Sequence, residues 1–189
     1  MRASGVLSPV DQLLEVLTVD DVELARRGDA AAKTRILEPL LDPGYRLAFS
    51  VLRRREAAED ALQDACYNAT RGLSTFRGDE SKVRPWFLKI VANQCRSQLR
   101  RPFFSWFPLP ESMPRPDFAG EVAASHDLGQ ALRSLSHQDQ LVLALFYYLD
   151  LPLAEVAVIV GLKEAGARSR LYRAVGQLRR LLQEPEVSG

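Results

Sequence analysis

Apolar residues recur at the spacing of an α-helix along almost the whole chain. This periodicity predicts helices at 18–27, 30–41, 43–53, 56–75, 84–101, 127–134, 137–149, 152–160 and 163–183. Capping residues support several boundaries, because Asp29 and Ser136 each precede a predicted helix, and Asp150 or Leu151 should open the helix at 152–160. A shorter apolar stretch at 10–17 should add a loosely attached turn or helix. The predicted fold class is therefore all-α.

A break in the helical pattern divides the chain. Residues 102–126 contain five prolines and no helical period, which is typical of a linker between domains. We therefore expect two small helical domains, at 18–101 and 128–183, joined by a linker at 102–127. Aromatic residues in the linker should either fold back on a domain or dock on a partner, and they are Phe103, Phe104, Trp106 and Phe107.

The helix predicted at 84–101 has two unlike faces. Its apolar side should face the core and comprises Phe87, Ile90, Val91, Cys95 and Leu99. Its opposite side comprises Trp86, Lys89, Asn93, Arg96 and Arg100. The range holds five basic residues and no acid, whereas solvated helices usually mix both signs. This face suits contact with phosphates and bases, and a basic helix that arginine merely keeps soluble is the alternative.

The helix predicted at 56–75 has a polar face that is mainly acidic and amidic. Its apolar side comprises Leu62, Ala65, Cys66, Ala69 and Leu73, and its polar side Glu56, Asp60, Gln63, Asp64, Tyr67 and Arg71. Such a face is either simply solvated or, because acids repel nucleic acid, reserved for a protein partner.

The last two predicted helices form a helix-turn-helix pattern. Gly161 permits a tight turn between 152–160 and 163–183. Small residues near the start of the second helix allow close approach to base edges, and arginines can reach bases or phosphates. This outward face comprises Ala165, Gly166, Arg168, Ser169, Arg170, Tyr172 and Arg173. An ordinary helix pair is the alternative, and the one-sided charge favours DNA binding.

Composition excludes several classes of function. The two cysteines, Cys66 and Cys95, are too few and too far apart for a zinc knuckle or a disulfide framework, and neither His126 nor His137 lies beside a ligand cluster. No phosphate-binding glycine loop or catalytic motif is present, so we expect no enzyme activity, metal or cofactor.

No apolar run approaches the roughly 20 residues that span a bilayer, and no signal peptide is recognisable, so we expect a cytoplasmic protein without membrane insertion.

Taken together, the two halves resemble the extracytoplasmic-function sigma factors, the minimal members of the sigma-70 family. The resemblance covers about 20–183. The first half matches through RGD at 27–29, AEDALQD at 58–64, Phe76, PWFLKIVAN at 85–93 and LRR at 99–101. The second half matches through PLAEVA at 152–157, GL at 161–162 and RSRLYRA at 168–174. Two motif sets in the right order make a specific signal.

The resemblance implies an alternative sigma factor that binds core RNA polymerase and initiates transcription. It assigns docking on the polymerase β′ coiled coil to Asp60, Gln63, Asp64 and Tyr67. It assigns recognition and melting of the −10 element to Phe76, Arg77, Lys82, Arg84, Trp86, Lys89, Asn93, Arg96, Arg100 and Arg101. It assigns −35 recognition to Arg168, Ser169, Arg170, Tyr172 and Arg173. Implied partners are the β′ and β subunits, promoter DNA and, by analogy with many relatives, an anti-sigma factor.

Two departures from the family pattern lie at the start of the helix predicted at 163–183, which the resemblance assigns to −35 recognition. Lys163 replaces the usual cap and Gly166 the usual Thr, which should soften the first turn of this helix. Two other functions remain open from the residues alone. One is a conventional helix-turn-helix regulator that acts without docking on core polymerase, and the other is a helical adaptor with no role on DNA.

Overall fold

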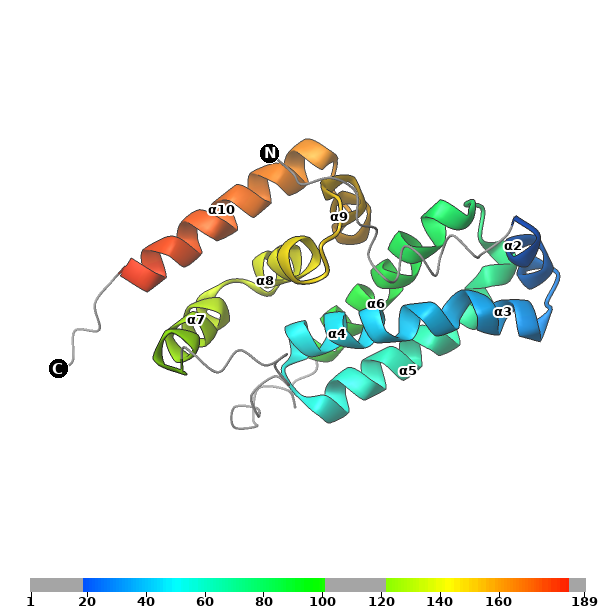
Figure 1. The fold of residues 1–189 in the computed structure, drawn as a ribbon, viewed down its shortest axis with the longest axis horizontal. Helices are drawn as coiled ribbons and strands as arrows, with labels where there is room; N and C mark the ends of the chain where they lie inside the picture. The colour runs from blue at the N-terminus through cyan, green and yellow to red at the C-terminus, as the bar shows by residue number, and fades with distance from the viewer. Residues whose placement is uncertain (1–18, 101–121, 184–189) are drawn as a thin grey trace.

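The computed structural model of the chain describes residues 19–100 and 122–183, and all the regular structure in these ranges is helical, as predicted. In the first half, α4, α5 and α6 pack against one another, while α2 and α3 pair at one end (Figure 1). The helices of this half are α2 (Val19–Arg26), α3 (Ala30–Leu37), α4 (Leu41–Leu52), α5 (Arg55–Gly72) and α6 (Val83–Leu99).

The predicted start of α3 is confirmed, whereas the junction between α3 and α4 differs. Asp29 caps α3, since its Oδ1 accepts a hydrogen bond of 2.6 Å from the Ala32 amide. The break expected between 41 and 43 lies instead at Glu38–Leu40, a 3₁₀ turn with Pro39 at its start. Gly44 lies inside α4, at the point where Leu62 of α5 and Phe87 of α6 come close to its backbone.

The second half contains the predicted helix-turn-helix. Its elements are α7 (Val122–Ser134), α8 (His137–Leu143), a π-helical turn (Ala144–Tyr148), α9 (Leu153–Val160) and α10 (Glu164–Gln183). Ser136 caps α8, since its Oγ accepts a bond of 3.2 Å from the Asp139 amide. Gly161 ends α9 in the left-handed conformation, with φ of 73°, as the tight turn requires.

Three boundaries in the second half correct the sequence-based expectation. α7 begins at Val122, so helix extends into the segment that we assigned to the linker. The helix expected over 137–149 ends at Leu143 and continues as the π-helical turn. Pro152, and not Asp150 or Leu151, opens α9, because its carbonyl accepts the first amides of that helix.

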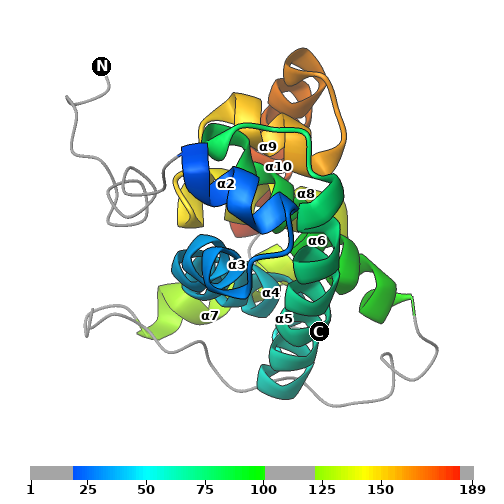
Figure 2. The ribbon, with the colours of Figure 1, turned by 90° about the vertical axis from the view of Figure 1, so that its right-hand side faces the viewer.

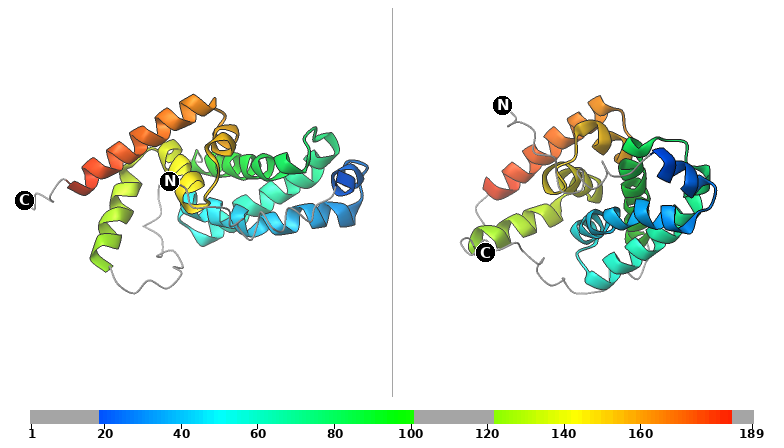
Figure 3. Two further views of the ribbon diagram at one scale, coloured as in Figure 1. Left: turned by 45° about the horizontal axis from the view of Figure 1, so that its top comes forward. Right: turned by 45° about the vertical axis from the view of Figure 1, so that its right-hand side comes forward.

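The two halves pack directly on each other. α9 lies on α6, α8 lies beside α4, and buried side chains from both halves join in one apolar cluster (Figures 2 and 3). Two arginines bridge the halves. The Arg46 guanidinium lies 4.5 Å from the centre of the Tyr148 ring, and Arg96 Nη2 donates to the Ile159 carbonyl at 3.4 Å. The expected division into two helical units is present, but the units are in contact.

Three expectations concern residues outside the described ranges. They are the apolar stretch at 10–17, the aromatic linker residues at 103–107 and the −10 contact assigned to Arg101.

Candidate nucleic-acid interface

The polar face of α5 is solvent-exposed along its length. Asp60, Gln63, Asp64 and Tyr67 are all exposed, and the Tyr67 side chain keeps 62% of its surface accessible. The opposite side of α5 is lined with buried alanines, so the helix presents one face to the core and the other to solvent. Arg71 Nη1 donates to the Tyr67 hydroxyl at 3.0 Å, which holds this ring at the surface.

Near the start of α5 a carboxylate is neutralised by an ion pair, whereas two carboxylates on its exposed face are unpaired within the described residues. Glu59 pairs with Arg55 at 2.8 Å, one turn away. Among the residues that the structure describes, Asp60 and Asp64 have no ion pair. Exposed carboxylates without an ion pair can bind basic side chains of a partner.

The basic row of α6 is exposed except at one position. Lys89, Asn93 and Arg100 face solvent, whereas Arg96 is half-buried. The Arg96 guanidinium donates to Asn93 Oδ1 at 2.8 Å, so the only amide in the row is oriented by a neighbouring cation.

α9 covers the half-buried position of this row. Arg96 Nη2 reaches the Ile159 carbonyl of α9, and Arg96 Nε is buried without a hydrogen-bond partner. Burial, with the charge of Arg100 in addition, lowers the pKa of Arg96 below its ordinary value. In this arrangement of the halves, Arg96 is less accessible to solvent than its predicted contact with DNA requires.

Two further residues that we assigned to −10 DNA pack into the protein. Phe76 is only 8% exposed and its ring centre lies 4.9 Å from that of Trp86, which is half-buried. Arg84 is only 7% exposed. Phe76 and Arg84 therefore offer little surface to DNA in this structure, and their direct contacts stay predictions that require these side chains to become more exposed.

The segment 76–83 is bound by a residue that the sequence analysis missed. Arg26 Nε donates to the Phe76 carbonyl at 2.8 Å, and Arg26 Nη2 donates to the Gly78 carbonyl at 2.6 Å. Arg77 and Lys82 in this segment are exposed, as their predicted role requires. No spacing signal could have identified Arg26, because it lies 50 residues before its first partner.

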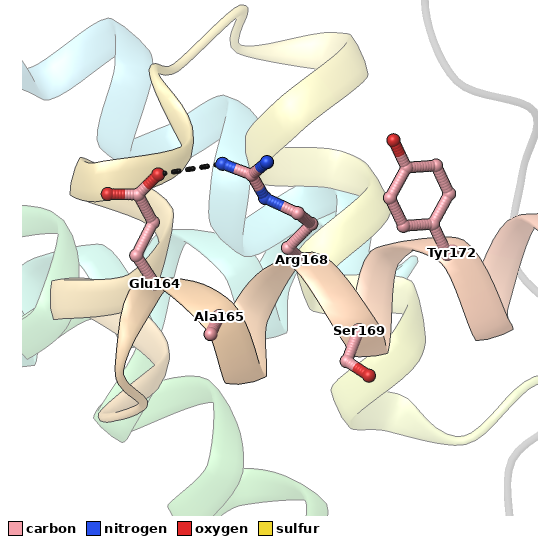
Figure 4. Close-up of a pocket in the computed structure, with 5 residues that line it drawn as sticks. All are labelled: Glu164, Ala165, Arg168, Ser169 and Tyr172. Carbon is pink, nitrogen blue, oxygen red and sulfur yellow. Dashed lines mark hydrogen bonds and ion pairs between the residues drawn. The ribbon is translucent and has the colours of Figure 1, made fainter.

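The outward face of α10 presents a mixed surface of arginine, hydroxyl and aromatic groups. Arg168, Ser169, Tyr172 and Arg173 are exposed, and Tyr172 is accessible over 71% of its surface. Arg168 pairs with Glu164 at 3.1 Å (Figure 4). A hollow on this face is lined by Glu164, Ala165, Arg168, Ser169 and Tyr172 (Figure 4).

Arg170 does not belong to the free surface of α10. Its Nη1 donates to Gln138 Oε1 at 2.7 Å and lies 4.0 Å from Asp139 Oδ1, so the guanidinium ties α10 to the start of α8. Helical periodicity placed Arg170 on the same side of α10 as the residues predicted to contact DNA. The structure gives it an intramolecular role, because α8 lies within its reach.

The cysteines are structural in character. Cys95 is buried, and burial raises the pKa of its thiol to about 12, while burial also raises the pKa of the half-buried Cys66. In the ranges that the structure covers, no three His, Cys, Asp or Glu side chains gather as metal ligands. Within those same ranges, no helix combines the length and apolarity needed to cross a bilayer.

Comparison with known proteins identifies both halves. Residues 36–102 match the family Sigma-70 region 2, and residues 125–178 match Sigma-70, region 4. The ECF RNA polymerase sigma factor SigM of Mycobacterium tuberculosis (strain H37Rv) is 34% identical over 139 residues, which cover 73% of this chain and 70% of SigM. The RNA polymerase sigma factor SigV of Bacillus subtilis is 29% identical, over 76% of this chain and 87% of SigV.

Solved structures share the fold. CnrH, in complex with the cytosolic domain of CnrY, superposes with a TM-score of 0.64 at 20% identity, over 86% of this chain and 95% of CnrH. The sigma factor RpoE of Bartonella quintana, in complex with the anti-sigma factor NepR, gives 0.62 at 24% identity, over 78% of this chain and 94% of RpoE.

Regions 2 and 4, in this order on one helical chain, define a sigma-70-type initiation factor. The chain belongs to the extracytoplasmic-function (ECF) RNA polymerase sigma factors. It is an alternative sigma factor that binds core RNA polymerase and promoter DNA, and the conventional regulator is not favoured.

Proposed function

We propose that the exposed face of α5 is the main contact with core polymerase. The face formed by Asp60, Gln63, Asp64 and Tyr67 would dock on the β′ coiled coil, with the two carboxylates meeting basic side chains there. The observation that carries this proposal is the segregation of charge. Carboxylates without ion pairs lie on α5, and a row without acids lies on the adjacent α6.

The promoter contacts follow from the remaining two surfaces. Residues 76–83, which we call the −10 loop, would act with the exposed row of α6 in recognising and melting the −10 element. Asn93 suits base recognition, because it is the uncharged member of this row, whereas Lys89 and Arg100 suit phosphates. α10 would enter the major groove at the −35 element, where Arg173 is free to reach a base edge.

For one molecule to bind the −10 and −35 elements at the same time, the two halves must separate. The −10 and −35 elements are named for positions about 25 base pairs apart, which is roughly 85 Å along B-form DNA at about 3.4 Å per pair. Here α6 packs on α9, and α9 packs on α10. Packed helices lie about 8–10 Å apart, so the surfaces assigned to the two elements are too close together to reach both at once. We therefore assign residues 18–101 and the helices from Val122 onward to two domains that part in the promoter complex, with the intervening residues as the linker.

The setting of this function is the cytoplasm, where core polymerase acts. The chain itself would not be a catalyst, because catalysis belongs to the polymerase. An anti-sigma factor is a proposed further partner, supported by the likeness in fold to RpoE of Bartonella quintana, which was solved with the anti-sigma factor NepR.

Binding to core polymerase tests the docking face. Reversing charge in the double variant Asp60→Lys/Asp64→Lys should weaken core affinity at least tenfold and abolish run-off transcription, because both carboxylates would then repel basic partners. The unfolding free energy should stay within about 0.5 kcal/mol of the wild-type value, because both side chains are exposed.

A matched control reverses two exposed acids outside this face. The variant Glu38→Lys/Asp42→Lys changes net charge by the same amount at the junction of α3 and α4. Because Asp42 lies 4.0 Å from Arg46, which contacts the other half, the single variant Glu38→Lys is measured as well, and both should bind core polymerase like the wild type. Equal affinity of all these proteins for core polymerase would overturn the assignment of α5.

A further inference from the structure

Arg26 joins the end of α2 to the −10 loop, 50 residues further along the chain. Its guanidinium spans two carbonyls, with Nε on Phe76 at 2.8 Å and Nη2 on Gly78 at 2.6 Å. Both distances are those of strong charge-assisted hydrogen bonds. These two carbonyls lie on either side of Arg77, so the contact fixes the backbone from which the exposed Arg77 side chain projects.

The remaining contacts of Arg26 hold its guanidinium in place. Nη1 lies 3.3 Å from Glu23 Oε2, and the bonds from Arg26 and Arg27 lower the pKa of the Glu23 carboxyl. The Arg26 side chain is 32% exposed, so the guanidinium is only partly available to solvent. Its donors are therefore directed to the loop and to Glu23.

The other side of the same loop is fixed by close packing. The Phe76 ring packs on Trp86, and the Arg26 guanidinium lies 6.0 Å from the centre of the Phe76 ring. A Cβ on Gly78 would overlap this ring and would lie 2.9 Å from Lys82 Cβ. The loop conformation therefore depends on Arg26 on one side and on the absence of a side chain at Gly78 on the other.

We infer that Arg26 is a positioning residue for recognition of the −10 element, acting by holding the backbone around Arg77 in its binding conformation. This inference rests on the proposed role of the −10 loop. Arg26 need not touch DNA, and its charge alone is not sufficient, because the planar guanidinium reaches the two carbonyls from two different nitrogens, whereas a lysine ammonium would present all its donors from one atom. The arginine at position 27 is the natural control, since it also bonds Glu23 but is 73% exposed and makes no bond to the loop.

The test compares Arg26→Lys with Arg27→Lys in holoenzyme reconstituted from the full chain and core polymerase. The template is a library randomised over the −10 element behind the −35 sequence that the wild type selects. Arg26→Lys keeps the charge but loses the fork, so preference at one −10 position should fall about tenfold. Core affinity and −35 preference should be unchanged, and Arg27→Lys should behave as the wild type.

Two further measurements keep the inference falsifiable. Hydrogen exchange at the Phe76 amide, which bonds the Leu73 carbonyl at 3.3 Å, should be faster in Arg26→Lys and unchanged in Arg27→Lys. Gly78→Ala disturbs the loop without changing Arg26, and it should flatten the same −10 preference.

The outcomes separate the possible roles. Wild-type −10 preference in Arg26→Lys, with unaltered exchange, overturns the inference. So does a uniform loss of affinity in Arg26→Ala that Arg26→Lys restores, because that pattern identifies a phosphate contact. If the wild type itself selects no promoter with core polymerase, the proposed function fails, while the exchange measurement still decides whether Arg26 holds the loop.

Discussion

Three arginines on α10 lie close together in sequence and have three different environments. Arg168 pairs with Glu164 on its own helix, and Arg170 bonds Gln138 on α8. Arg173 is exposed and has no ion pair within the part of the chain that the structure describes. Helical periodicity predicted the shared face, but it could not distinguish these environments, because the partner of Arg170 lies 32 residues away in sequence.

The difference predicts distinct effects of mutation on −35 binding. Arg173→Ala should lose discrimination at one −35 position, because a bidentate contact with a base contributes about 1–3 kcal/mol. Arg168→Ala should weaken all sequences about equally, as loss of a phosphate contact does. Affinities for a −35 library decide between the two roles. A uniform loss for Arg173→Ala, with altered preference for Arg168→Ala, would mean that α10 is rotated differently in the groove.

Helix faces were predictable from the sequence, whereas several helix ends were not. The exposed row of α5 and the buried stripe of α6 follow from periodicity alone, because a helix places residues three or four apart on one side. The π-helical turn after α8 did not follow. The Leu149 amide bonds the Ala144 carbonyl, five residues back, at 2.9 Å, and apolar periodicity does not distinguish this wider turn from the last turns of an α-helix. Asp150 makes the turn with φ of 50°.

Two helical glycines give a contrast that tests the packing. A Cβ on Gly166 would meet only Leu162 Cβ at 3.7 Å, which is ordinary contact, so Gly166→Ala should raise the unfolding free energy by about 0.5–1 kcal/mol. A Cβ on Gly44 would lie 2.9 Å from both Leu62 Cδ1 and Phe87 Cε1, so Gly44→Ala should lower it by about 1–3 kcal/mol. Urea unfolding of both variants measures these changes, and a stabilised Gly44→Ala would refute the helix crossing.

The packing of the two halves belongs to the whole molecule and had no signal in the sequence. α9 buries Ile159 in the cluster that also contains Phe87 of α6. The contact forms between apolar faces of α6 and α9. Helical periodicity predicts that each face is buried, but it does not indicate which element covers it. The contact also explains why Arg96, predicted to face DNA, is half-buried here. The sequence therefore predicted both domains and most of their surfaces, but not the arrangement that covers one of them.

Weakening the contact between the halves should favour the separated form. Arg46→Ala removes the contact with Tyr148, which we expect to contribute about 1 kcal/mol and thus to shift the equilibrium between packed and separated halves about fivefold. Small-angle scattering should show a larger radius of gyration for Arg46→Ala than for the wild type. Arg27→Ala, which alters an exposed arginine of α2, should leave the radius unchanged. An unchanged radius in Arg46→Ala would mean that the halves do not separate through this contact.

The most direct test of the sigma-factor function is selection of genomic DNA by the chain with and without core polymerase. The holoenzyme should enrich fragments that share two motifs centred about 25 base pairs apart, and the same fragments should support run-off transcription from a start downstream of the second motif. The chain alone should enrich them far less. Equal enrichment of a single motif in the absence of core polymerase would contradict this function and would indicate a conventional helix-turn-helix regulator.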